Sequence, residues 1–226
     1  VSGGKDSVAL TMALHWLRRF IGIDYELVAI TLDPQFGEEP GDFSEIAAMC
    51  KDLGVPYVVL PTDIGKIVFE IRQEASPCSL CARMRRGFLY SKAQERGCNK
   101  IALGHHQDDI LETLLMNMTF QGAISTMPPR LVMRKFDMTI IRPLCLVHEA
   151  ELAELARIRG YQKQLKNCPY EKDSYRTDMK EVLRTLERMN PEARYSLWNS
   201  MTNVQADLLP VYAERRGAKT RSNNEI

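Results

Sequence analysis

Short apolar runs rich in β-branched residues alternate with helical segments, and this alternation restricts the fold more than any other feature of the sequence. Buried strands are expected at residues 26–32, 57–60 and 100–104. Helices are expected at residues 7–20, 44–53, 63–74, 80–97 and 109–120. Strands separated by helices form a parallel sheet with helices on both faces. The sequence therefore predicts an α/β fold with a doubly wound parallel sheet, whose ligands lie beyond the carboxyl ends of the strands.

The pattern changes after Pro128-Pro129. A hairpin is expected at residues 131–141, followed by helices at 149–159, 178–189 and 191–203. We therefore expect a catalytic domain over residues 1–165, a C-terminal helical extension over 166–210 and a flexible polar tail over 211–226. Val1 leads directly into a glycine turn of the kind that follows a buried strand, so we expect the first strand upstream of the printed sequence.

Composition places the chain among ordinary globular proteins. Of its 226 residues, 45% are apolar and 26% charged, and no apolar run approaches the roughly 20 residues that span a bilayer. The net charge of +1 means that any nucleic acid must be bound by local basic patches. Six cysteines are too few for a disulfide scaffold, so we expect a cytoplasmic protein in which paired cysteines serve metal or redox chemistry.

The hexapeptide SGGKDS joins an expected strand end to the first turn of a helix. Its glycines allow successive backbone N–H groups to point at one anion, and the helix N-terminus adds positive potential. A tight turn with a serine cap is the plain alternative, but six specific residues at this junction favour an anion site. The residues that would hold a pyrophosphate are Ser2, Gly3, Gly4, Lys5, Asp6 and Ser7.

A second polar motif, Gly104-His105-His106-Gln107-Asp108-Asp109, follows the strand expected at 100–104. In a parallel sheet this places it at the same edge as the glycine turn. Asp108 and Asp109 are candidate magnesium ligands, although acidic residues also cap helices and both roles are compatible. Gly104, His105 and Asp33, which ends the first expected strand, are candidate nucleotide-binding residues, and a structural role for the histidines is equally open.

Cys78 and Cys81 form a Cys-x-x-Cys pair at an expected helix start. Two thiolates at this spacing can bind one metal centre, and a redox pair or simple packing are the alternatives. Cys168 lies in a loop, where a third thiolate is free to point at a metal. The other three cysteines, Cys50, Cys98 and Cys145, have apolar neighbours that favour packing. Three thiolates leave one coordination position of a metal centre open for chemistry, whereas a structural zinc site normally uses four protein ligands.

The helix after this cysteine pair is basic. Between residues 83 and 100 six basic residues face a single acid, Glu95, and Arg83, Arg85 and Arg86 are the candidate RNA contacts. Arg130, Arg134, Lys135 and Arg142 extend the basic surface in this prediction. A solvated helix face is the usual meaning of a charge run, but acids are nearly absent here while the whole chain is balanced.

Taken together, these motifs resemble a known family. SGGKDS differs from the GxxxxGK[ST] loop of kinase-like NTPases and is similar to the PP-loop of the N-type ATP pyrophosphatases. The runs SGGKDS, PCSLCARMRRG, IALGHHQDDILETLLMN, MPPR, IRPL and the late Cys168 occur in the order seen in the tRNA 2-thiocytidine synthetases. Members carry a second cysteine three residues beyond the late one, where this sequence has Glu171. Only the first of that pair is implied as a ligand.

The resemblance implies the chemistry directly. ATP and Mg²⁺ would adenylate the C2 oxygen of cytidine 32 in the tRNA anticodon loop, and sulfur carried on a 4Fe-4S cluster would then displace AMP. Lys5, Asp6 and Asp109 would serve the first step, and Cys78, Cys81 and Cys168 would hold the cluster. A cysteine desulfurase or another sulfur donor, and a homodimeric state, are further implications. The target cytidine would have to leave its stack to reach the pocket.

Three alternatives remain at this level. The related 2-thiouridine enzymes often carry additional Cys-x-x-Cys zinc knuckles, which this sequence lacks. The lysidine synthetases share the glycine turn but need no cysteine triad. A nucleotide- and metal-binding module without turnover, or one that holds zinc in place of a cluster, is the alternative outside this class of enzymes.

Overall fold

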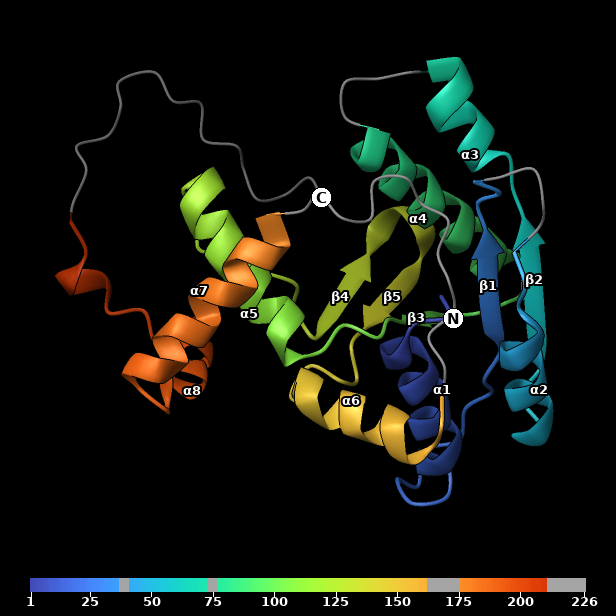
Figure 1. Ribbon diagram of the computed structural model, residues 1–226, viewed down its shortest axis with the longest axis horizontal. Coiled ribbons are helices and arrows are strands. Elements are labelled where there is room, and N and C mark those ends of the chain that lie inside the picture. The colour runs from blue at the N-terminus through green and yellow to red at the C-terminus, as the bar shows by residue number, and fades with distance from the viewer. Residues whose placement is uncertain (37–40, 73–76, 162–174, 211–226) are drawn as a thin grey trace.

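The computed structural model describes residues 1–36, 41–72, 77–161 and 175–210 (Figure 1). Its elements follow in the order α1 (Lys5–Leu17), β1 (Ala29–Asp33), α2 (Ser44–Asp52), β2 (Tyr57–Pro61), α3 (Ile64–Lys66), α4 (Pro77–Glu95), β3 (Lys100–Ala102), α5 (Gln107–Met116), β4 (Arg130–Met133), β5 (Met138–Ile141), α6 (Glu149–Ile158), α7 (Tyr175–Met189) and α8 (Ala193–Ser200). Helices α3 and α5 each continue into a π-helical turn, at Ile67–Arg72 and Asn117–Gln121.

The described strands form two sheets. β1 and β2 are parallel, with Ala29 opposite Tyr57. In the other sheet β5 is central, parallel to β3 and antiparallel to β4. Val1 lies beside β1, because its amino group donates to the Ile30 carbonyl and Thr31 Oγ1 donates to the Val1 carbonyl at 2.7 Å. The α/β class and the hairpin expected at 131–141 are confirmed, with a short 3₁₀ turn at Arg134–Phe136 between β4 and β5.

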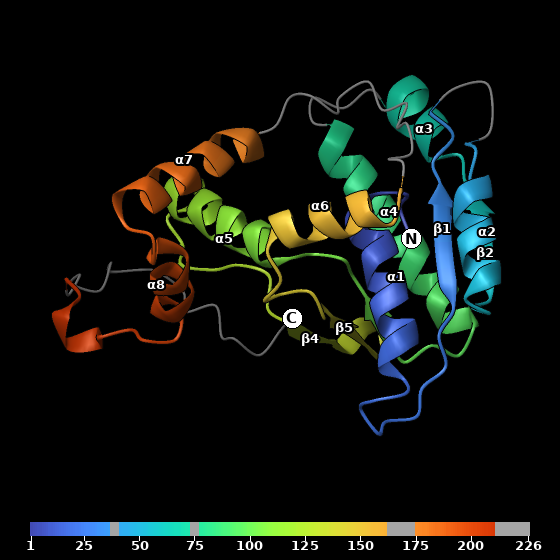
Figure 2. The same ribbon diagram turned by 60° about the horizontal axis from the view of Figure 1, so that its bottom comes forward.

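Helices cover the strands through small apolar clusters, each of which follows the predicted periodicity. Ile46 and Cys50 of α2 are buried against Ala29 of β1. Leu10 of α1 packs with Leu152 of α6, and the two helices lie side by side in Figures 1 and 2. Removing such surface from water contributes about 25 cal/mol per Å². This packing fixes the N-terminus of α1 close to that of α6.

The C-terminal helices pack against α5. α7 lies beside α5 in both ribbon views and crosses it in Figure 1, and Met179 and Leu183 of α7 are buried. The chain then turns at Asn190, whose carbonyl accepts from the Ala193 amide at 2.9 Å, and α8 follows. This arrangement brings the residues of α7 and α8 to the start of α5, where the second polar motif lies.

Two sequence predictions fall outside the described residues. They are the third cysteine, Cys168, and the polar tail at 211–226. Within the described ranges, no helix is both long and apolar enough to cross a membrane.

Candidate functional site

The glycine turn is closed by its own side chains. Gly3 has a φ of +71°, a value that favours glycine, and α1 begins directly after Gly4. Ser7 Oγ accepts from the Ser2 amide at 3.1 Å and donates to the Gly4 carbonyl at 2.9 Å. Among the described residues, no side chain caps the first turn of α1. An uncapped helix start is the kind of place where backbone amides can bind an anion, and the anion site here stays a prediction.

Lys5 is held at this turn by two carboxylates. Its Nζ lies 2.9 Å from Asp6 Oδ1 and 3.4 Å from Glu149 Oε1, at the start of α6. Partial burial alone would lower the pKa of Lys5, but Asp6 and Glu149 outweigh it and raise the pKa above its ordinary value. Lys5 is therefore a fixed positive charge at the N-terminus of α1.

Gly104 brings the second motif against the glycine turn. A Cβ atom on Gly104 would lie 3.0 Å from the Asp6 carbonyl oxygen and 3.2 Å from the Ser7 nitrogen, both of them backbone atoms. The approach therefore requires a residue without a side chain. The structure thus unites SGGKDS and GHHQDD, as the strand order predicted.

The acidic pair serves as two helix caps. The Asp109 side chain accepts from the His106 amide at 3.1 Å, and His106 Nδ1 accepts from the Asp109 amide, which makes a capping box for α5. Asp108 points the other way and accepts from the Glu149 amide at 2.8 Å, which caps α6. The capping role considered for these aspartates is confirmed, while a magnesium role stays a prediction.

Cations from the C-terminal helices neutralise this acidic cluster. Arg176 of α7 lies 3.2 Å from Asp109 Oδ1, and Arg194 of α8 lies 2.8 Å from Asp108 Oδ1. Lys180 of α7 donates to Glu149 Oε2. The sequence analysis missed these three residues. The available signal was the four-residue spacing of Arg176, Lys180, Arg184 and Arg188, which places basic groups along one side of a helix.

Burial and charge separate the titration of two acids in this cluster. Burial would raise the pKa of Asp108, but His106, the Glu149 amide and Arg194 lower it well below its usual range. Burial first, and then the charge of Asp109, raise the pKa of Glu112 to about 7, although Arg176 opposes this. Asp108 is a permanent anion, whereas Glu112 changes charge near neutral pH.

Asp33 and His105 are held by local hydrogen bonds at strand ends. Asp33 is buried, and its two carboxylate oxygens accept from the Gln35 and Gly41 amides at 3.0 and 3.1 Å, so it orders the loop after β1. His105 Nδ1 accepts from Arg142 Nε at 3.3 Å, and burial lowers the pKa of His105. Asp33 is the last residue of β1 and His105 lies in the loop after β3, and the nucleotide role of both stays a prediction.

One basic residue was placed wrongly by the sequence analysis. Arg142 was included in the basic surface, yet only 7% of it is exposed. Its guanidinium donates to the Pro128 carbonyl and to His105, and its backbone amide donates to the Pro129 carbonyl at 2.8 Å. Arg142 directly follows β5, and its bonds hold the MPPR segment against the end of that strand. It is therefore not available for RNA.

The cysteine pair opens α4 and spans the boundary between solvent and core. Cys78 is exposed, whereas Cys81, one turn later, is buried beside Ile64 and Val68. Residues three apart lie on one side of a helix, and a common metal centre for the two thiols stays a prediction. Of the packing predictions, Cys50 is fully buried. Within the described residues no cluster of three potential metal ligands is formed, and Cys168 lies outside them.

Residues 1–163 match the family of the PP-loop domain. The tRNA-cytidine(32) 2-sulfurtransferase of Geobacter metallireducens is 44% identical over 91% of this chain and 80% of its own length. The enzyme of the same name from Geobacter sulfurreducens is 43% identical over the same shares of the two chains.

The chain belongs to the tRNA-cytidine(32) 2-sulfurtransferase family.

The resemblance stated from the motifs is thereby confirmed. Among solved structures, the chain is similar to the U34-tRNA thiolase NcsA from Methanococcus maripaludis with its [4Fe-4S] cluster, with a TM-score of 0.70 and 24% identity. That likeness covers 95% of this chain and 72% of the thiolase and supports the fold.

In this family member the predicted RNA contacts lie on one exposed stretch of α4. Arg83, Arg85 and Arg86 are exposed, and none of them forms an ion pair or hydrogen bond with another described residue. Lys92, further along α4, is instead paired with Glu95 at 2.8 Å. Within the part of the chain that the structure describes, these three guanidinium groups near the cysteine pair have no partner, and their contact with RNA phosphates stays a prediction.

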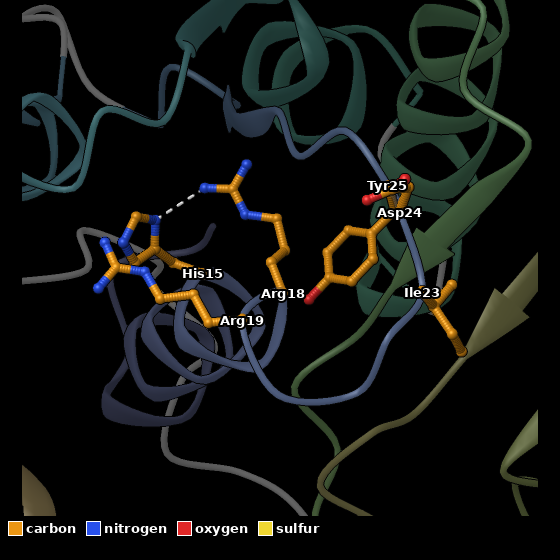
Figure 3. Close-up of a pocket in the computed structure, with 6 residues that line it drawn as sticks. All are labelled: His15, Arg18, Arg19, Ile23, Asp24 and Tyr25. Carbon is orange, nitrogen blue, oxygen red and sulfur yellow. Dashed lines mark hydrogen bonds between the residues drawn. The ribbon is translucent and has the colours of Figure 1, made fainter.

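A shallow hollow lies at the opposite end of α1 from the glycine turn. Figure 3 shows Arg18 pointing toward His15, with Arg18 Nη2 2.9 Å from His15 Nδ1, and Tyr25 closing one side. Arg19 lies over the neighbouring Trp16 ring at 5.4 Å. The residues that line this hollow include none of the motif residues.

Proposed function

We propose that this chain is an ATP-dependent tRNA sulfurtransferase that replaces the C2 oxygen of cytidine 32 with sulfur. The observation that carries the proposal is the 44% identity, over nine-tenths of the chain, to a relative of that name. The glycine turn, the GHHQDD motif and the cysteine pair of that family are intact here. The competing reading as a binding module without turnover has no comparable support.

The glycine turn would orient ATP for the first step. The free amides after Gly4 and the ammonium of Lys5 suit the β- and γ-phosphates, with Ser2 and Ser7 as hydroxyl partners. The C2 oxygen of the cytidine attacks the α-phosphorus, and pyrophosphate leaves. Because the turn is preformed, its positive groups need no rearrangement as charge develops on the leaving group. Asp33, Gly104 and His105 would line the rest of the nucleotide site.

Magnesium would be held by carboxylate oxygens, which it prefers as ligands. Asp109 is the better candidate, because its carboxylate is the more exposed of the two, at 16% against 8% for Asp108. Both oxygens are engaged in each residue, with the Glu149 amide and Arg194 at Asp108 and with the His106 amide and Arg176 at Asp109, so exposure is what separates the two. The greater exposure of Asp109 supports placing the magnesium there within the predicted pair.

Cys78 and Cys81, with Cys168, would hold a 4Fe-4S cluster. The exposed and the buried thiol of the pair fit two positions of one centre. When bound, such a cluster would supply the sulfur that replaces the adenylated oxygen at C2, and that oxygen would leave with AMP. Arg83, Arg85 and Arg86 would bind the tRNA backbone beside this centre.

The remaining parts of the proposal concern the cellular setting. We place the enzyme in the cytoplasm, where its tRNA substrate is found, with a cysteine desulfurase or another source of sulfide as donor. We also propose a homodimer. Sedimentation equilibrium tests the dimer, and thiolation with a desulfurase and cysteine in place of sulfide tests the donor.

The decisive experiment is mass spectrometry of tRNA nucleosides. The protein is reconstituted with iron and sulfide without oxygen and incubated with ATP, magnesium, sulfide and unmodified tRNA. We expect 2-thiocytidine, and its loss when ATP is omitted or when Cys78→Ala or Cys168→Ala is used. A Cys50→Ala variant, which changes a buried packing cysteine, is the matched control and should retain thiolation.

Each other outcome has a defined meaning. Appearance of 2-thiouridine would keep the chemistry and change the target base. Zinc in place of a brown, iron-containing protein would contradict the cluster. Bound ATP with no release of AMP or pyrophosphate when tRNA is added would favour the binding module.

A further inference from the structure

Glu149 lies between two lysines that come from opposite ends of the chain. Its Oε1 is 3.4 Å from Nζ of Lys5, in the glycine turn, and its Oε2 accepts from Nζ of Lys180, on α7. The three side chains are 28% to 34% exposed, so each is shielded from bulk water but can still be reached by a ligand. A single carboxylate therefore fixes two ammonium groups side by side.

The position of Glu149 creates an electrostatic problem that Lys180 solves. An anion bound at Lys5 would lie close to the Glu149 carboxylate, which would repel it. Burial would raise the pKa of Glu149, but Lys180 and Lys5 lower it below its ordinary value, so the carboxylate is charged at neutral pH. Phosphate binding at Lys5 consequently needs a second cation at this point, and Lys180 is already there.

The other basic residues of α7 have different partners, and Arg176 lies against Asp109 and Glu112 of α5. Arg184 and Arg188 both pair with Glu181, an exposed residue on the same helix. Such exposed pairs contribute little to stability or to a site. Lys180 instead reaches across to α6, where Asp108 has already fixed the start of the helix through the Glu149 amide. Its placement thus depends on the packing of α7 against α5.

We propose that Lys180 is a second phosphate-binding residue, which moves from Glu149 to the β- or γ-phosphate when ATP binds at the glycine turn. The inference rests on the proposed function and adds a residue from outside the segment that matches the PP-loop domain, residues 1–163. Lys5 and Lys180 would then hold the polyphosphate from two sides. Glu149 would keep both lysines in place before ATP arrives.

The test measures binding of a non-hydrolysable ATP analogue with magnesium by calorimetry, without tRNA. Loss of a charge-assisted contact should weaken binding about tenfold in Lys180→Met. Lys180→Arg keeps the charge and should bind the analogue within about threefold of the parent. The remaining loss of affinity would come from the different shape of the guanidinium group. Arg184→Met, one turn further along α7, is the matched control and should bind like the parent. Thermal unfolding of each variant shows whether the fold is retained.

A second measurement uses the unaltered protein. Limited acetylation of lysines, quantified by mass spectrometry, should show that the analogue protects both Lys5 and Lys180 while Lys92 reacts as before. Unchanged affinity in Lys180→Met, or protection of Lys5 alone, overturns the inference and leaves Lys180 as a structural ion pair. If the unaltered protein binds no analogue, the proposed function itself fails, which is a different result.

Discussion

Gly104 shows how one missing side chain places two motifs together. Its Cα approaches the Asp6 and Ser7 backbone so closely that a Cβ would lie 3.0 to 3.2 Å from three atoms that cannot rotate away. The turn after β3 and the start of α1 therefore touch through their backbones. This contact sets the distance between the glycine turn and the acidic cluster.

Replacing Gly104 by Ala should therefore disturb both stability and nucleotide binding. We expect a cost of about 1–2 kcal/mol in the free energy of unfolding, because the backbone must shift to admit the methyl group, and weaker binding of an ATP analogue. Urea denaturation and calorimetry measure the two effects. Gly87→Ala, in the middle of α4 with no atom within 4 Å of the added Cβ, is the control and should stabilise the protein. Equal behaviour of the two variants would contradict this account.

Glu112 makes the free energy of unfolding depend on pH. Burial and Asp109 raise its pKa to about 7 in the folded protein, against 4.5 as the ordinary value. The folded state therefore binds a proton more tightly than the unfolded state. Stability is lost as the pH rises from about 4.5 to about 7, and the loss is complete above that range.

Glu112→Gln should remove this loss. The variant should gain up to about 3 kcal/mol over the parent at pH 8 and little at pH 4, because Gln carries no charge to bury. Unfolding free energies measured between pH 4 and 8 give the difference at each pH. The same measurement on Glu26→Gln, an exposed residue, should show no trend. A difference between Glu112→Gln and the parent that did not vary with pH would falsify the assignment.

At the scale of elements, α7 and α8 are fastened to α5 by ion pairs as well as by Leu183 and Met179. The most buried pair joins Arg194 to Asp108, whose side chains are 17% and 8% exposed. Since Asp108 also caps α6, this one carboxylate links α5, α6 and α8. If Asp108 loses its Arg194 partner, the packing of all three helices should be weakened.

Arg194→Met should destabilise the protein by about 3 kcal/mol, because a buried carboxylate is left without its cation. Chemical denaturation measures the change. The double variant Asp108→Asn with Arg194→Met should recover part of the loss, since no charge then remains buried. Arg157→Met, which breaks a fully exposed pair with Glu154, should leave the unfolding transition where it is. A stable Arg194→Met protein would show that the pair is not needed.

The elements that position the site could be read from the sequence, whereas their ionic contacts could not. The periodicity around Val8 and Leu10, and the glycines of SGGKDS, fix a helix after a tight turn through local chemistry alone. The pairing of Lys180 with Glu149 depends on how α7 packs on α5, which is set by contacts far apart in the sequence. Arg142 looked like a surface cation because its burial depends on where β5 ends in the fold.

For the whole molecule, the distribution of charge matters more than its sum. The net charge is only +1, and the cations of α7 and α8 described here are paired with acids. The three arginines near the start of α4 differ, because they have no ion-pair partner among the described residues. A polyanion such as tRNA should therefore be drawn to α4, and the attraction should be sensitive to salt.

The triple variant Arg83→Gln, Arg85→Gln and Arg86→Gln tests this distribution. Its affinity for tRNA should fall at least about tenfold, and the slope of log Kd against log salt should decrease by about 2, because two or three phosphate contacts are lost. Binding of the ATP analogue should not change. The control replaces Arg157, Arg184 and Arg188 by Gln, which removes the same charge from residues paired with Glu154 or Glu181. Equal loss of tRNA affinity in both triple variants would show that net charge controls binding and would contradict the prediction. Loss in the α4 variant alone would show that the three arginines of α4 form the binding surface.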